Sequence, residues 1–182
     1  MSVIITGISG VGKSFIGNKI ASLLQYNVIN IGHLILENFS QIHPIDKQRE
    51  SACDFIGKVL TNDRLIIDMH TVLWLENKIE VCLTYSDILS MRAKAIIVIE
   101  SDVIRIVQQR LNDAEIRKDR ILDDSLQHLH NMQNRQKEVI LSLMNTYSIP
   151  SIFINNRCVS TEKNISIIQD FIKVVNNEKS IL

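Results

Sequence analysis

The sequence near the N-terminus reads Gly7-Ile8-Ser9-Gly10-Val11-Gly12-Lys13-Ser14. It fits the pattern G-x-x-x-x-G-K-[ST], and it lies between a β-branched run, Ser2–Thr6, and a segment whose apolar residues recur at helical spacing. In such a context the glycines let successive backbone N–H groups turn toward an anion, and the positive end of the helix dipole adds to the attraction. The stretch therefore predicts a phosphate-binding loop, or P-loop, between a buried strand and a helix.

The residue types of this loop predict ATP with Mg²⁺ as its ligand. Lys13 has the reach for the β- and γ-phosphates, and the Ser14 hydroxyl is suited to bind Mg²⁺. We expect Lys13 to lie exposed at the loop, so that its replacement would leave the fold intact. The expected nucleotide-binding residues are Gly7, Ser9, Gly10, Val11, Gly12, Lys13, Ser14 and Phe15.

Short apolar runs alternate with amphipathic segments along all 182 residues, a length that suits one domain. The expected strands are Ser2–Thr6, Val28–Ile31, Leu65–Asp68, Ala95–Ile99 and Ser151–Ile154. Helices are expected from Phe15 to Leu24, over Gly32–Phe39, after an Asp46 N-cap, from Ser101-Asp102 to about Leu111, from Leu126 to Leu143, and over 161–175. Residues 71–94 are ambiguous apart from a turn at Asn77-Lys78. The alternation is typical of an α/β fold with a parallel sheet covered on both faces.

The composition of the chain limits the classes of partner that we expect. Lys+Arg and Asp+Glu number 20 each, and this zero net charge argues against non-specific nucleic-acid binding. The apolar runs are far shorter than the roughly 20 residues of a membrane span, so no membrane partner is expected. Cys53, Cys82 and Cys158 lack metal-ligand spacing, which predicts free thiols in a reducing cytoplasm.

Two polar residues follow the apolar run that begins at Leu65. Asp68 would lie at the mouth of the sheet, where a carboxylate can hold Mg²⁺ through water as a Walker B aspartate does. His70 is a candidate contact for a substrate phosphate or ribose. The alternatives are a strand-end aspartate that caps a turn and a histidine that only makes structural hydrogen bonds.

A basic stretch could neutralise the charge that develops during phosphoryl transfer, because arginine is suited to bidentate phosphate contacts. It comprises Arg110, Arg117, Lys118 and Arg120, with Arg135 further along. Acidic residues are interspersed, so a solvated face with ion pairs is the alternative.

With these motifs the chain resembles the archaeal-type adenylate kinases, which are P-loop nucleoside monophosphate kinases. The resemblance rests on the P-loop, on Asp68-Met69-His70, on Arg110-Leu111-Asn112-Asp113 and on Leu129–Arg135, which has one extra residue between Met132 and Asn134. It implies a P-loop NTPase fold with a five-stranded parallel sheet and helices on both faces. It also implies transfer of the γ-phosphoryl group of ATP, with Mg²⁺, to a small-molecule acceptor that is a nucleoside monophosphate.

The resemblance implies residue roles as well. The implied catalytic residues are Lys13, Asp68, Arg117, Arg120 and Arg135; the acceptor-binding residues are His70, Gly32 and Arg49, with His43 and Lys47 nearby. Arg110 would lie near the adenine of ATP, and residues 112–124 would form a mobile lid on a single domain, 1–182. The lid order Arg117-Lys118-Asp119-Arg120 and the segment Thr71–Asp87 both depart from the family pattern. A homo-oligomer is left open.

Two other functions stay open. If the acceptor is a hydroxyl, Asp68 could serve as its base, and the protein would be a small-molecule or nucleoside kinase. A nucleotide-dependent regulatory ATPase belongs to a different class. An AAA-type motor is disfavoured by the length of the chain, and a GTPase by the lack of an Asn-Lys-x-Asp motif.

Overall fold

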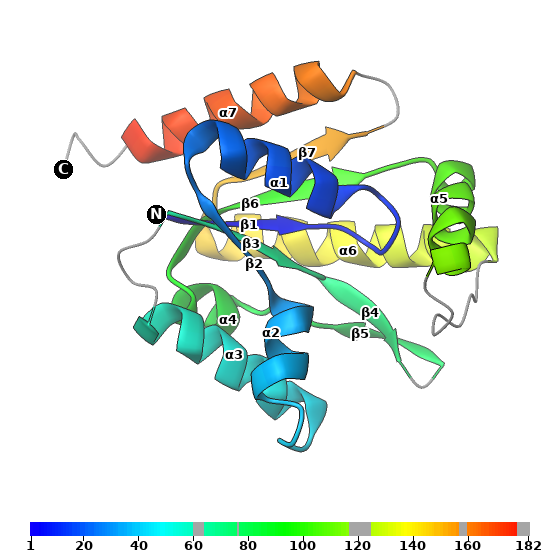
Figure 1. The fold of residues 1–182 in the computed structure, drawn as a ribbon, viewed down its shortest axis with the longest axis horizontal. Coiled ribbons are helices and arrows are strands. Elements are labelled where there is room, and N and C mark those ends of the chain that lie inside the picture. Colours follow the sequence, from blue (N-terminus) through cyan, green and yellow to red (C-terminus); the bar gives the residue numbers. More distant parts are fainter. Residues whose placement is uncertain (60–63, 76, 117–124, 157–159, 178–182) are drawn as a thin grey trace.

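The computed structural model describes residues 1–59, 64–75, 77–116, 125–156 and 160–177. Its main sheet has five parallel strands in the order β2-β3-β1-β6-β7 (Figure 1). The strands are β1 (Ser2–Thr6), β2 (Asn27–Asn30), β3 (Leu65–Met69), β6 (Ala93–Glu100) and β7 (Ser151–Asn155). The predicted α/β fold with a five-stranded parallel sheet is therefore confirmed.

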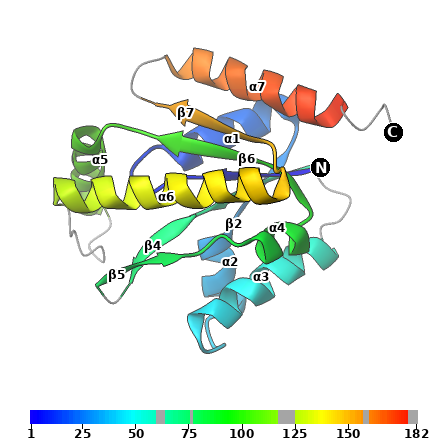
Figure 2. The ribbon, with the colours of Figure 1, turned by 180° about the vertical axis from the view of Figure 1, so that it is seen from behind.

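Helices cover both faces of this sheet, as Figures 1 and 2 show from opposite sides. One face carries α1 (Lys13–Leu24) and α7 (Thr161–Asn177), and the other carries α3 (Ile45–Val59), α4 (Tyr85–Ser90) and α6 (Leu126–Tyr147). Alternate residues of β1 join opposite cores: Val3 and Ile5 pack with α1 and α7, whereas Ile4 packs with α3, α4 and α6. Alternation in a strand between two buried faces makes every residue apolar, which explains the short unbroken runs in the sequence.

Two more helices flank the carboxyl edge of the sheet, where the strands end. The α2 helix (Ile31–Asn38) follows β2 directly and packs against α3. The α5 helix (Val103–Ile116) follows β6 and packs against α6. Both helices therefore begin at the edge where the P-loop emerges from β1.

The ambiguous stretch after β3 forms a separate antiparallel hairpin, β4 (Val72–Leu75) and β5 (Lys78–Val81). It extends from the carboxyl edge of the sheet and packs against α6 (Figure 2). The predicted turn at Asn77-Lys78 is confirmed, because Asn77 has a left-handed φ of 62°, a conformation that asparagine tolerates. The chain then enters α4 through a capping box between Thr84 and Asp87.

Two predicted helix boundaries were wrong. Asp46 lies in the first turn of α3 and not at an N-cap, because the helix begins at Ile45. The α5 helix continues past Leu111 to Ile116, so residues 112–116 of the expected lid are helical. The rest of that lid, 117–124, lies outside the described residues.

Several apolar residues of the helices face solvent and not the core. They are Phe15, Leu23, Phe55, Val59 and Leu126, whose exposed fractions lie between 38% and 60%. Each helix rests on the sheet by a narrow stripe, such as Ile16 and Ile20 of α1, so flanking apolar residues stay outside it. Among the described residues no helix is long and apolar enough to cross a membrane.

The thiol prediction is confirmed for two of the three cysteines. Cys53 is buried and free, and Cys82 is half-buried and free. Cys158 lies outside the described residues.

Gly57 of α3 sits against the backbone of α4, and a Cβ there would lie 1.7 Å from the Ser90 carbonyl oxygen. We expect Gly57→Ala to lower the free energy of unfolding by about 1–3 kcal/mol, because α3 and α4 must separate. Gly17→Ala is the matched control, since its Cβ would make ordinary contacts of 3.5–3.6 Å with Ile5 and Ile66. Helix propensity should then raise stability by roughly 0.5–1 kcal/mol. Urea unfolding followed by circular dichroism measures both; equal stability of the two variants would contradict this packing.

Candidate active site

The P-loop has the strand–loop–helix geometry that its motif predicted. β1 ends at Thr6 and α1 begins at Lys13. Between them Gly10 and Gly12 have φ values of 91° and 87°, a left-handed conformation that favours glycine. Gly12 is the N-cap of α1 and brings no side chain to the helix start, so the first-turn N–H groups are left to bind an anion.

Three side chains hold the carbonyl groups of this loop from outside. His70 Nδ1 lies 3.0 Å from the Gly7 oxygen, Arg110 Nε donates to the Ser9 oxygen at 3.0 Å, and Asn156 Nδ2 donates to the Val11 oxygen at 3.0 Å. The three residues come from the segment after β3, from α5 and from the end of β7. The loop is thus fixed in shape before any ligand arrives, which lowers the cost of binding phosphate.

Asp68 occupies the centre of the site and is only 2% exposed. Its Oδ2 accepts hydrogen bonds from Ser14 Oγ at 2.6 Å and from Asn30 Nδ2 at 3.1 Å. Its Oδ1 lies 3.9 Å from Lys13 Nζ and has no hydrogen-bond partner within the described part of the chain. Asn30 and Asp68 are register partners on neighbouring parallel strands, so their side chains meet on one face of the sheet.

These residues fit the ligands that the motif implies. Ser14 Oγ and the Asp68 carboxylate are hard oxygen donors of the kind that Mg²⁺ takes from a protein when phosphates and water supply the rest of its shell. The buried Asp68 Oδ1 without a hydrogen bond also leaves one acceptor to be satisfied by a ligand. Within the described ranges no group of three His, Cys, Asp or Glu side chains forms a closed metal cage.

The expectation that Lys13 is exposed was wrong, because the residue is 8% exposed. Its side chain turns toward the buried Asp68 carboxylate, so the charge of each group stabilises the other. Lys13 is therefore part of the packed edge of the sheet as well as of the loop.

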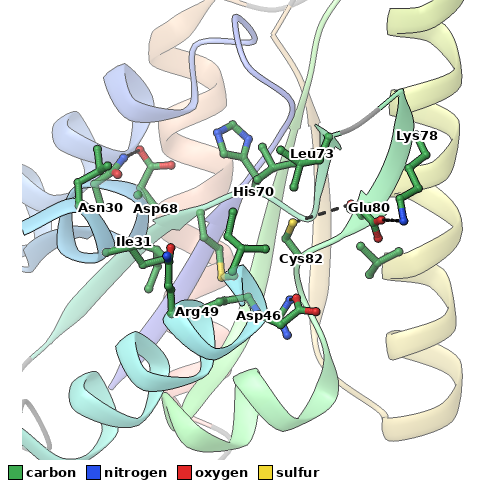
Figure 3. Close-up of a pocket in the computed structure, with 18 residues that line it drawn as sticks. Asn30, Ile31, Asp46, Arg49, Asp68, His70, Leu73, Lys78, Glu80 and Cys82 are labelled. Carbon is green, nitrogen blue, oxygen red and sulfur yellow. Dashed lines mark hydrogen bonds and ion pairs between the residues drawn. The ribbon is translucent and has the colours of Figure 1, made fainter. Parts of the chain in front are cut away.

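A cavity of about 470 Å³ opens beside Asp68 (Figure 3). We call it the hairpin cavity, because β4 and β5 form one wall and α2 and α3 the other. It is lined by Asn30, Ile31, Gly32, Ile35, Leu36, Ile45, Asp46, Gln48, Arg49, Asp68, Met69, His70, Leu73, Leu75, Lys78, Glu80, Val81 and Cys82. It brings together all three residues expected on the acceptor side, Gly32, Arg49 and His70, next to Asp68.

Ion pairs occupy the charged groups around this cavity. Arg49 donates from Nη1 to Asp46 at 3.2 Å and from Nε to the buried Asp87 at 3.4 Å. Lys78 pairs with Glu80 at 2.6 Å. Burial raises the pKa of the Cys82 thiol to about 11, so this cysteine stays neutral near pH 7.

Other predicted site residues are not brought into this group. Arg135 is half-exposed on α6 and pairs there with Glu138 at 3.0 Å. Phe15 is 57% exposed, with Lys19 Nζ over its ring. Neither His43 nor Lys47 is among the cavity-lining residues, and both are exposed. Arg117 and Arg120 lie outside the described residues.

Sequence reasoning missed Asn30, Asn156 and the hairpin wall. Asn30 and Asn156 each stand at or just after the end of a strand, which was the available signal, but asparagine is common in such turns. Their contacts appear only when separate strand ends meet at one edge.

Solved structures with similar folds cover nearly the whole chain. Shikimate kinase from Acinetobacter baumannii, in complex with shikimate, has a TM-score of 0.64 and 12% identity over 95% of this chain and 93% of its own. Gluconokinase from Sinorhizobium meliloti has a TM-score of 0.61 and 16% identity over 98% and 95%. Deoxyadenosine kinase from M. mycoides, with bound dCTP, has a TM-score of 0.57 and 14% identity over 96% and 100%. At such identities the likeness establishes the fold, which is that of P-loop kinases.

Sequence comparison assigns the chain to a family. No curated protein matches the sequence. The family model described as AAA domain matches residues 6–130, which is more than half of the chain and includes the P-loop, Asp68 and the hairpin cavity. The chain therefore belongs to the AAA domain family of P-loop proteins.

Proposed function

We propose that this protein is an ATP-dependent kinase that phosphorylates a small molecule bound in the hairpin cavity. The observation that carries the proposal is the meeting of Lys13, Ser14 and Asp68 where the P-loop adjoins that cavity. A phosphate donor on the loop and an acceptor in the cavity would then lie on either side of Asp68. Holding both reactants in this way supplies much of the catalysis of phosphoryl transfer.

The loop residues would bind the donor. The amides at the start of α1 and the Lys13 ammonium group would hold the phosphates of ATP, and Arg110, tied to the Ser9 carbonyl, would lie beside the nucleotide. Ser14 Oγ, oriented by its hydrogen bond to Asp68, would hold Mg²⁺. When bound, Mg²⁺ neutralises charge on the phosphates. Arg117, Arg120 and Arg135 remain candidates for further charge neutralisation.

A hydroxyl-bearing acceptor is the first candidate. Asp68 has one oxygen saturated by Ser14 and Asn30, which leaves Oδ1 to take the proton of an acceptor hydroxyl. Lys13 lies over Oδ1, and its movement toward a phosphate would uncover that oxygen. The structural neighbours are named for shikimate, gluconate and deoxyadenosine, and each of these molecules bears hydroxyl groups.

A nucleoside monophosphate is the second candidate, as in the archaeal-type adenylate kinases. The sequence Asp68-Met69-His70 and the place of Arg49 in the cavity wall favour it. The phosphate of such an acceptor is already an anion, so no base would be needed. A panel of nucleosides, their monophosphates, shikimate and gluconate, assayed with Mg²⁺-ATP for ADP formation, distinguishes the two acceptor classes.

The same panel tests the whole proposal. A regulatory ATPase would hydrolyse ATP slowly, would need a macromolecular partner and would phosphorylate none of these molecules. We also keep the prediction that the protein is not an AAA-type motor. Processive motor activity would contradict this prediction.

Lys13→Ala should lower the rate of phosphoryl transfer by about 10²–10³-fold, because it removes a cation from the transferred group. The buried position of Lys13 means that the variant also leaves Asp68 without its neighbouring charge, so thermal unfolding must be measured beside activity. If the alanine variant melts early, Lys13→Met is the second variant, because methionine retains the apolar part of the lysine side chain. Lys19→Ala, on an exposed part of the same helix, is the control. Full activity in a folded Lys13 variant would contradict the assigned role.

Asn30→Asp should lower the transfer rate by about 10–100-fold without loss of the fold. Asn30 Oδ1 accepts the His33 N–H at the start of α2, and aspartate preserves this cap. The exchange replaces the donor 3.1 Å from Asp68 Oδ2 by a second carboxylate, which repels it. Kinetics together with the melting temperature measure the effect. Asn38→Asp, at the exposed end of α2, is the matched control, and equal losses in both variants would refute a specific role for Asn30.

A further inference from the structure

The residues that line the hairpin cavity restrict the class of molecule that it can bind. The cavity volume of about 470 Å³ suits a molecule of the size of a nucleoside or a bicyclic alcohol. Two features of the walls, their charge and their apolar surface, point to one class of acceptor. This assignment of the acceptor rests on the proposed kinase function and deepens it.

We propose that the acceptor is an uncharged alcohol with an apolar or aromatic body, which packs against the inner face of the β4–β5 hairpin. The hydroxyl of this molecule lies toward Asp68. Its body lies between the hairpin and α2, which contribute Leu73, Leu75, Ile31 and Ile35 to the cavity lining. An acceptor that carries its own phosphate is disfavoured at this site.

The charge of the cavity supports the exclusion of an anionic acceptor. Its lining contains three carboxylates, Asp46, Asp68 and Glu80, against two cations, Arg49 and Lys78. Arg49 lies between Asp46 and Asp87, at 3.2 and 3.4 Å, so that group of three side chains carries a net negative charge. A phosphate dianion that reached the Arg49 guanidinium would be repelled by the Asp46 carboxylate in the lining and by the buried Asp87 carboxylate, and this repulsion would offset the attraction.

The hairpin presents two leucines and one ion pair to the cavity. In its antiparallel register Leu73 pairs with Glu80 and Leu75 with Lys78, so these four side chains share one face, and all four line the cavity. Trp74 and Ile79 share the opposite face and pack into the core, where Trp74 contacts His128 of α6. The buried outer face anchors the hairpin, and the inner leucines remain to contact a ligand.

Other residues of the cavity lining are apolar or neutral. Met69 and Val81 are among them, and the Cys82 thiol is neutral because its pKa is raised by burial. A site walled by aliphatic side chains with a few convergent polar groups favours a ligand whose body is apolar and whose reactive end is polar.

Calorimetry on the full chain, with Mg²⁺ and a non-hydrolysable ATP analogue present, tests the proposal with matched pairs of probes. Each pair consists of an uncharged alcohol and its monophosphate ester: naphthylethanol and naphthylethyl phosphate, and thymidine and thymidine monophosphate. We expect at least one alcohol to bind, and each alcohol that binds to do so roughly tenfold or more tightly than its ester. The double variant Leu73→Ala, Leu75→Ala should weaken binding of that alcohol by about tenfold or more, because apolar contact area is lost.

Leu23→Ala is the matched control, since Leu23 is 60% exposed on α1 and is not among the cavity-lining residues. If the double alanine variant melts early, Leu73→Gln keeps the side-chain size and removes the apolar surface. Equal or tighter binding of the esters, no binding of either alcohol, or alcohol binding that is unchanged in a folded hairpin variant would overturn the proposal. Alcohol preference in a chain that does not bind the ATP analogue would support the cavity assignment and refute the kinase function.

Discussion

The burial of the Asp68 carboxylate is the constraint on which the rest of the site depends. A carboxylate removed from water is stable only where donors and cations replace its hydration. Here the replacements come from Ser14 and Lys13 at the start of α1 and from Asn30 at the end of β2. All of them stand at the carboxyl edge of one parallel sheet, so the strand order that places β3 between β1 and β2 is also what makes this charge tolerable.

The same edge determines the shape of the phosphate loop. Gly7 leaves no room for a side chain, since a Cβ there would lie 2.7 Å from the Ile99 oxygen of β6. The neighbouring elements then hold the loop carbonyls through His70, Arg110 and Asn156. A loop held at several points along its length does not need to reorganise when it binds an anion, and such preorganisation is the main source of electrostatic catalysis. The hydrogen bond of His70 to the Gly7 oxygen therefore helps to hold the shape of the phosphate loop.

Sequence alone was sufficient for the parts of this design that depend on local pattern. The P-loop follows from its glycines, and the parallel sheet follows from apolar runs such as Ala95–Ile99, which must be buried on both faces. Asp68 was predictable because a carboxylate directly after such a run stands at the carboxyl edge. These inferences need only the chain within a few residues of the feature.

The missed features depend on contacts between distant segments. Strand β4, Val72–Leu75, shows no polar alternation, because one of its faces packs on α6 and the other lines the cavity with leucines. A four-residue apolar run of this kind cannot be told from helix by period. The burial of Lys13 was missed for a related reason, since its charge is matched by Asp68, which is 55 positions away in the chain.

The division between predicted and missed features coincides with a division in the site itself. The side proposed for the phosphate donor is built from the sheet edge, where Lys13 and Asp68 need each other's charge, so it has little freedom to vary. The side proposed for the acceptor is built from α2, α3 and the hairpin, which lie outside the sheet. Specificity can change there without loss of the nucleotide site, in keeping with one fold serving many substrates. In the proposed kinase the carboxylates of Asp46 and Asp87 would act in this way, because they form ion pairs with Arg49, the one arginine in the described cavity lining.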